Sequence, residues 1–279
     1  MGLRSAKIDA ETKVLNSTPV CAYPANVISM SNSTWSGRHT GKDALRQRIW
    51  STLKAHKATR RDPVGHIPNF LGAEVAAARL AETSLWQRAQ VIKCNPDSPH
   101  TAVRLKALVD GKTLYMAVPR LFRKKCFVEL TATALEQKGV ALKEAASMGG
   151  AMSHGRLMTY AEMQAIELVV VGCVAVTLNG GRTGKGAGFA DLELAMLREC
   201  DLIAEDTPIV TTVHDLQVVD TALLPMQPHD WGLDLIVTPT RCLATDNNHP
   251  KPQGLDWDSI QPDQIANIPI LRAWSKRRS

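Results

Sequence analysis

A glycine-rich stretch at residues 179–191 constrains the fold of this chain more than any other segment. It contains five glycines and follows the apolar run 168–176, whose β-branched residues predict a buried strand. The next residues, 192–197, carry apolar side chains at helical spacing, which places the glycines in a strand-to-helix turn. Glycines in such a turn tolerate positive φ angles and leave the backbone bare. Main-chain N–H groups at a helix start, together with Arg182 and Lys185, predict a site for phosphate or another anion.

The glycine spacing differs from the two common nucleotide-binding motifs. In a P-loop the lysine is followed by Ser or Thr, whereas Lys185 is followed by Gly186. The dinucleotide-binding fingerprint does not have glycines that alternate strictly, as Gly184, Gly186 and Gly188 do. A flexible surface turn is the alternative interpretation of the glycines alone. The two cations within the stretch and the strand in front of it favour an anion site.

The overall composition is that of a globular protein with a modest excess of positive charge. Of the 279 residues, 44% are hydrophobic and 22% are charged, and the formal net charge is +6. This charge is compatible with an anionic ligand but is too small to predict nucleic-acid binding by itself. No apolar run approaches the roughly 18 residues of a membrane span, so we expect no membrane partner. The six cysteines form no C-x-x-C pair, which argues against a zinc site. The N-terminus shows no secretory signal, so we expect a cytoplasmic protein with reduced thiols.

Short apolar segments alternate with helical patterns along most of the chain. The pattern predicts strands at 90–94, 112–118, 168–176, 207–213 and 234–238, and helices at 42–56, 72–89 and around 103–109. This alternation predicts an α/β protein with a mostly parallel sheet and helices on both faces. Between 127 and 165 we expect a helix, a flexible loop at 147–155 that is a connector or a substrate lid, and a second helix. We expect a poorly ordered arm over residues 1–40, one α/β domain over 41–246 and a C-terminal extension over 247–279.

Three polar segments are expected at one edge of this sheet. Asn95, Arg120 and the stretch 179–191 each follow a predicted strand. Parallel strands place their carboxyl ends at a common edge, which is where ligands bind in α/β proteins. The helix before the first strand adds Lys42 and Arg46, which lie one helical turn apart on the same stripe. These two side chains form either a solvated basic face or a phosphate contact.

The residues from Gly181 to Asp191 resemble the signature of 5-formyltetrahydrofolate cyclo-ligases, G-R-x-G-x-G-x-G followed by two aromatic residues and Asp. A second block resembles the family's downstream pattern in order and spacing, and comprises His214-Asp215-Leu216-Gln217, Leu224-Pro225, His229-Asp230, Asp234 and Thr238. Further blocks at 66–73, 93–97, 118–121 and 237–241 are similar to a divergent branch, the methenyltetrahydrofolate synthetase domain-containing proteins. The resemblance extends from about Gly41 to about Trp257 and implies the Rossmann-like fold of the cyclo-ligases.

The resemblance implies an enzyme that uses ATP and Mg²⁺. Cyclo-ligases use ATP to activate the formyl oxygen of 5-formyltetrahydrofolate, and ring closure gives 5,10-methenyltetrahydrofolate, ADP and phosphate. Carried over residue by residue, the nucleotide-binding positions are Lys42, Arg46, Gly181, Arg182, Gly184, Lys185, Gly186, Ala187, Gly188 and Phe189. Arg182 and Lys185 are the cations expected to stabilise the transferring phosphoryl group. Asp191 and Asp230 are the carboxylates expected near Mg²⁺, directly or through water.

The segments that hold the folate in the family are different in this chain. Residues 95–100 replace an acidic E-x-x-T segment and contain no glutamate, a W-x-x-x-x-P motif has no clear counterpart, and Ala190 replaces the second aromatic residue of the signature. We therefore expect either cyclo-ligase activity or ATP-dependent activation of another amide or formyl-like metabolite in cofactor salvage. A third alternative is a nucleotide- or RNA-binding module without catalysis. The 5% aromatic content and the lack of a nucleic-acid motif argue against it.

Overall fold

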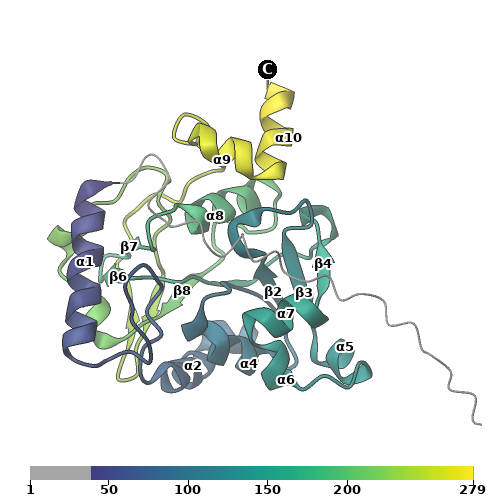
Figure 1. Cartoon of the computed structure of the whole chain (residues 1–279), viewed down its shortest axis with the longest axis horizontal. Helices are drawn as coiled ribbons and strands as arrows, with labels where there is room; N and C mark the ends of the chain where they lie inside the picture. Colours follow the sequence, from purple (N-terminus) through teal and green to yellow (C-terminus); the bar gives the residue numbers. More distant parts are fainter. Residues whose placement is uncertain (1–38, 279) are drawn as a thin grey trace, which may run out of the picture. The chain divides into compact units, whose positions relative to one another are not determined.

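A computed structural model describes residues 39–278, apart from the side chains of Arg120 and Arg278, and its centre is an eight-stranded sheet (Figure 1). In spatial order the strands are β11 (Cys242–Ala244), β10 (Leu235–Val237), β8 (Ile209–Thr212), β5 (Leu168–Val170), β1 (Val91–Cys94), β2 (Thr113–Ala117), β3 (Phe127–Leu130) and β4 (Arg156–Met158). The strands from β10 to β2 are parallel, whereas β11 and β3 run antiparallel to β10 and β2, and β4 runs antiparallel to β3. The predicted α/β fold with a mostly parallel sheet is confirmed.

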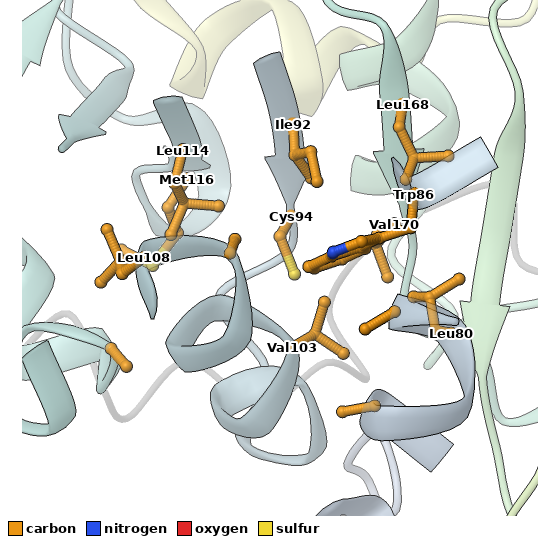
Figure 2. Close-up of a cluster of buried hydrophobic side chains, with 14 of the residues drawn as sticks. Leu80, Trp86, Ile92, Cys94, Val103, Leu108, Leu114, Met116, Leu168 and Val170 are labelled. Carbon is orange, nitrogen blue, oxygen red and sulfur yellow. The ribbon is translucent and has the colours of Figure 1, made fainter. Parts of the chain in front are cut away.

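Helices cover both faces of this sheet, as Figure 1 shows. One face carries α2 (Ala73–Ala81), α3 (Ser84–Arg88), α4 (Thr101–Val109), α5 (Ala132–Gln137), α6 (Leu142–Ala145) and α7 (Met148–His154), and the other carries α8 (Phe189–Glu199), α9 (Pro262–Asn267) and α10 (Pro269–Arg278). Successive strand residues alternate between the two hydrophobic clusters. In β1, Ile92 and Cys94 pack with Trp86 and α4 (Figure 2), while Val91 faces the cluster beneath α8. Because both faces are buried, the parallel strands have continuous apolar sequences.

Helix α1 (Thr40–Ala55) lies beside a second, three-stranded sheet of β7 (Arg182–Thr183), β6 (Ala175–Thr177) and β9 (Val218–Val219) (Figure 1). Leu45, Ile49 and Leu53 share one face of α1 and are buried in a cluster with Val174 and Ala175. The predicted helix at 42–56 is confirmed. It packs against the strands that flank the glycine-rich stretch.

The apolar run 168–176 forms two strands, and the prediction of one continuous strand is wrong. β5 ends at Val170 in the main sheet, and β6 begins at Ala175 in the small sheet. The chain passes between the sheets at Gly172, where a Cβ atom would lie 2.9 Å from Asp97 Oδ2. Residues on both sides of this point are fully buried, so hydrophobicity does not mark the break.

The region 127–165 differs most from the sequence prediction. It contains the antiparallel strands β3 and β4, which the sequence pattern does not predict. The expected flexible loop at 147–155 is largely α7, so this part of the prediction is wrong. The Ser147 hydroxyl caps this helix by accepting a hydrogen bond from the Gly150 N–H at 2.9 Å. This local hydrogen bond offsets the weak helix propensity of the neighbouring glycines.

Two other segments also differ from the expected pattern. The predicted helix at 72–89 is interrupted, because Thr83 ends the turn after α2 and caps α3 by accepting from the Trp86 N–H at 3.3 Å. The tail contains α9 and α10, and Ile268 and Leu271 are fully buried in one cluster with residues of α8. Residues 1–38 of the predicted N-terminal arm lie outside the described residues. Among the helices of residues 39–278, none combines the length and apolar character that crossing a bilayer requires.

Candidate functional site

The candidate site is built around the glycine-rich turn between β7 and α8. Arg182 belongs to β7 and not to the turn, which leaves residues 184–188 to connect the strand to the helix. Gly181 precedes β7, and a Cβ atom there would lie 2.5 Å from Thr177 Oγ1, so a larger residue would displace the turn or β6. Gly188 begins α8 with a φ angle of 67°, and no side chain among the described residues caps this helix. The first turn of α8 therefore presents main-chain N–H groups, as an anion site requires.

Arg182 is buried beneath the turn, with its guanidinium group held on two sides. Its Nε donates to the Trp231 carbonyl oxygen at 2.8 Å, and its Nη2 donates to Asp191 Oδ1 at 2.5 Å. Asp191 Oδ1 also accepts a hydrogen bond from the Trp231 N–H at 3.0 Å. Burial alone would lower the pKa of Arg182, but Asp191 and, to a smaller extent, Asp230 raise it, which keeps the guanidinium charged. Nη1 of Arg182 is buried and has no hydrogen-bond partner within residues 39–278.

Two cations from α1 reach the same turn from a distant part of the sequence. Lys42 forms an ion pair with Asp230, and the side chains of both are 8% exposed. Arg46, one helical turn later, donates from Nε to the Gly184 carbonyl oxygen at 2.7 Å and from Nη2 to Thr183 Oγ1 at 2.8 Å. Both cations are buried, so the solvated basic face that the sequence left open is excluded. The structure brings together the predicted cations of α1 and those of the glycine-rich stretch.

Lys185 is more accessible than the other predicted cations. Its side chain is 36% exposed, against 1% for Arg182. Its Nζ donates to Asp97 Oδ1 at 3.0 Å, across 88 residues of sequence. Burial alone would raise the pKa of Asp97, but Lys185 and His100 together hold it below its usual value. Sequence reasoning did not include Asp97 in the site, although it lies in the segment that departs from the family pattern.

Each of the four predicted cations is paired with an aspartate. The pairs are Lys42 with Asp230, Arg46 with Asp43, Arg182 with Asp191, and Lys185 with Asp97. The positive charge that the sequence places around the glycine-rich turn is therefore balanced by carboxylates from four different segments. The sequence identified two of these carboxylates, Asp191 and Asp230, as candidate metal ligands. It gave no role to the other two.

The carboxylates of the site fit a metal that arrives with a nucleotide. Within residues 39–278 no group of three or more His, Cys, Asp or Glu side chains is arranged to hold a metal ion. Asp191 and Asp230 lie close to each other, because Asp191 accepts a hydrogen bond from the N–H of Trp231, the residue after Asp230. Mg²⁺ is commonly bound by one or two carboxylates together with phosphate oxygens and water. The donor set is therefore sufficient for nucleotide-bound Mg²⁺ and too small for a metal held by protein side chains alone.

A second polar cluster follows β1, next to Asp97. Arg104 is fully buried in α4 and donates from Nη1 to the carbonyl oxygens of Asn95 at 2.5 Å and Asp97 at 3.2 Å. His100 is also fully buried, and neither ring nitrogen has a hydrogen-bond partner among the residues that the structure describes. Burial lowers the pKa of His100 to about 4, so the ring is neutral near pH 7. Arg120 follows β2, as predicted, but its side chain lies outside the described part of the chain.

Comparison with known proteins finds a matching family, sequence relatives and similar solved structures. A sequence model of the 5-formyltetrahydrofolate cyclo-ligase family matches residues 38–239. The chain is 38% identical over 238 residues to the methenyltetrahydrofolate synthase domain-containing proteins of Mus musculus and Homo sapiens, with 85% of this chain covered. It spans 63% and 62% of the length of these two relatives. Among solved structures, a 5,10-methenyltetrahydrofolate synthetase from Aquifex aeolicus is 16% identical with a TM-score of 0.45, covering 73% of this chain and 94% of that one.

Proposed function

Because this chain belongs to the 5-formyltetrahydrofolate cyclo-ligase family, we propose that it binds ATP with Mg²⁺ at the turn between β7 and α8 and uses the ATP to activate a folate derivative. The proposed reaction converts 5-formyltetrahydrofolate and ATP into 5,10-methenyltetrahydrofolate, ADP and phosphate. The observation that carries the proposal is the contact of Arg46 with Gly184, across 138 residues of sequence. It joins the basic stripe of α1 to a glycine-rich helix start, and phosphate binding requires both features.

The four cations have different roles in this proposal. Lys185 is the cation most able to follow a phosphate, because its side chain is the most exposed of the four and it projects from a turn of glycines. Lys42 and Arg46 line the same turn from α1 and hold the nucleotide phosphates in place. Arg182 orients Asp191 through its Nη2 group and offers the buried Nη1 as a further donor. Together they stabilise charge that develops on the transferring phosphoryl group.

Nucleotide binding in this site is an exchange of partners. Phosphate oxygens take the place of aspartate oxygens on Lys185 and Lys42, which leaves Asp97 and Asp230 without their counter-ions. Mg²⁺, when bound, would neutralise carboxylate and phosphate oxygens together and would supply electrostatic stabilisation of the phosphoryl group. Asp191 and Asp230 are the residues that hold it, directly or through water. We therefore expect ATP to bind far more tightly with Mg²⁺ than without it.

The residues of the site say less about the molecule that ATP activates than about ATP itself. In the segment 95–100, Asp97 is paired with Lys185 and His100 is a neutral buried ring. No glutamate stands in this segment. The alternative substrate is another amide or formyl-like metabolite, which ATP would activate by the same phosphoryl transfer to a carbonyl oxygen. The two substrates share the ATP site and differ only in the product that is formed.

Calorimetric titration with ATP and Mg²⁺, with and without 5-formyltetrahydrofolate, tests the proposal together with an absorbance assay for the methenyl product. We expect saturable Mg²⁺-dependent ATP binding that Lys185→Ala weakens and that Lys143→Ala, an exposed lysine of α6, leaves unchanged. Product formation would identify the folate as substrate. ATP binding without turnover would support the alternative substrate and call for a metabolite screen. Absence of ATP binding, with RNA binding that falls steeply with salt, would refute the enzyme proposal in favour of a non-catalytic module.

A further inference from the structure

A lysine occupies a central position of the main sheet. Lys93 is the third residue of β1, and its register partners are Tyr115 in β2 and Val169 in β5. All three residues are fully buried. A lysine is almost never buried at such a position unless its charge is paired. Lys93 forms an ion pair with Glu193 of α8 and donates a hydrogen bond to Asn95 Oδ1 at 3.2 Å.

Stability does not explain this ion pair. The side chains of Lys93 and Glu193 are 0% and 4% exposed, so both charges are removed from water. The attraction within a buried pair often fails to repay this desolvation, and well-packed apolar residues of similar volume are frequently as stable or more stable. The strand neighbours of Lys93, Tyr115 and Val169, belong to an apolar cluster, so an apolar side chain at position 93 would have apolar neighbours. The pair therefore needs a reason other than stability.

The pair joins the two elements that carry the candidate site. Glu193 is the fifth residue of α8, two residues beyond Asp191. On the other side, Asn95 and Asp97 lie two and four residues beyond Lys93, just after the carboxyl end of β1. An apolar contact between a helix and a sheet tolerates small shifts of register, whereas a buried ion pair loses its partner when the two elements shift, and in some proteins such pairs specify one arrangement. The pair thus connects β1 to α8 beside the first turn of the helix.

We propose that Lys93 and Glu193 are positioning residues that fix the first turn of α8, with Asp191 and the glycine-rich turn, against the carboxyl end of β1. Both side chains are too deeply buried to meet a phosphate, so they act through Asp191 and through the main chain of the turn. This inference rests on the nucleotide site proposed above for its effect on ligand binding. Its effect on the ligand-free protein is independent of that site.

The test replaces both charges at once by apolar residues of similar length, in the variant Lys93→Met/Glu193→Leu. The matched control, Arg60→Gln/Glu74→Gln, removes an exposed ion pair between residue 60 and α2. Three properties are compared in the full chain: the thermal midpoint, the dissociation constant for ATP with Mg²⁺, and amide hydrogen exchange in residues 186–193. We expect the double variant to melt near the parent, to bind ATP at least tenfold more weakly, and to exchange faster in residues 186–193 but not in α4.

Each outcome decides the inference. A folded double variant with parental ATP affinity and parental exchange in residues 186–193 would overturn it, because the pair would then be structural only. If the parent itself does not bind ATP, the proposed function fails, and exchange in residues 186–193 alone decides whether the positioning role stands. If the double variant does not fold, Lys93→Met/Glu193→Gln, which removes both charges and keeps the size of the Glu193 side chain, is judged by the same two readouts.

Discussion

Replacing His100 by glutamine should remove a loss of stability that the parent protein shows on mild acidification. Burial lowers the pKa of His100 in the folded protein to about 4, against an ordinary value of 6.5. Between these values the unfolded chain binds a proton that the folded protein does not bind. The part of the free energy of unfolding that depends on His100 is therefore at its full value above the ordinary pKa of 6.5. It is lost as the pH falls toward about 4, the pKa of His100 in the folded protein. Glutamine carries no titrating proton and abolishes this linkage.

The size of the His100 effect follows from the two pKa values. Each unit of pH below the ordinary value of 6.5 weakens the folded state by about 1.4 kcal/mol, so the loss on going from neutral pH to about pH 5 is about 2 kcal/mol. Urea unfolding followed by circular dichroism at the two pH values measures it. His56→Gln, at an exposed position after α1, is the control and should keep the parental loss. An equal loss in the parent and in His100→Gln would refute the reasoning, because His100 would then have the same pKa in both states.

The remaining predictions concern the glycine-rich turn and its carboxylates. Lys185→Ala should weaken ATP binding by about 1–3 kcal/mol. Asp97→Asn, which frees Lys185 from its competing partner, should tighten ATP binding by up to about 1 kcal/mol, or about fivefold. Calorimetry measures the ATP affinity of both variants, and an unchanged affinity in Lys185→Ala and in Asp97→Asn would contradict these two predictions. Gly181→Ala should lower the thermal midpoint by an amount equivalent to about 1–3 kcal/mol, since its Cβ would lie 2.5 Å from a threonine hydroxyl of β6, and a parental midpoint would show that the turn can shift. Asp191→Asn should reduce the Mg²⁺ dependence of ATP binding. It should also lower the free energy of unfolding by about 2 kcal/mol, because it removes the charged partner of buried Arg182. If ATP binding by this variant depends on Mg²⁺ as in the parent, Asp191 is not part of the metal site.

The sequence predicts the central strands well because each is an apolar run between polar turns. β1, β2, β8 and β10 all fall within predicted segments. The errors occur where burial is the same on both sides of a structural boundary. The run 168–176 is uniformly buried although it changes sheets, and β3 is short and followed by an alanine-rich region whose composition favours helix. Hydrophobic periodicity reports burial, and it cannot report which sheet a buried residue joins.

The candidate site was predictable where its residues are adjacent in sequence. The turn, its cations and Asp191 lie within one motif, and α1 was added because Lys42 and Arg46 match basic positions of the family; the basic stripe alone left a solvated face open. Partners that meet only in the folded chain were not predictable. Asp97 reaches Lys185 across 88 residues, and Glu193 looks like an ordinary polar residue of an amphipathic helix until β1 is known to lie opposite it. Resemblance identified the segment that contains Lys93 and Asp97, but not the ion pairs that they form.

Local charge balance makes the number of cations a poor measure of how strongly this site attracts an anion. An anion that arrives alone gains Lys185 or Lys42 but leaves Asp97 or Asp230 unpaired beside its own negative charge. A ligand that brings an anion and a divalent cation together can satisfy both halves of the Lys42–Asp230 pair, because Asp230 is a proposed Mg²⁺ ligand. The same reasoning disfavours an RNA backbone, whose phosphates do not each carry a tightly bound divalent cation. Under the proposed function, the paired aspartates would therefore favour a metal-bound nucleotide over other anions, a selectivity that an array of unpaired lysines and arginines would lack.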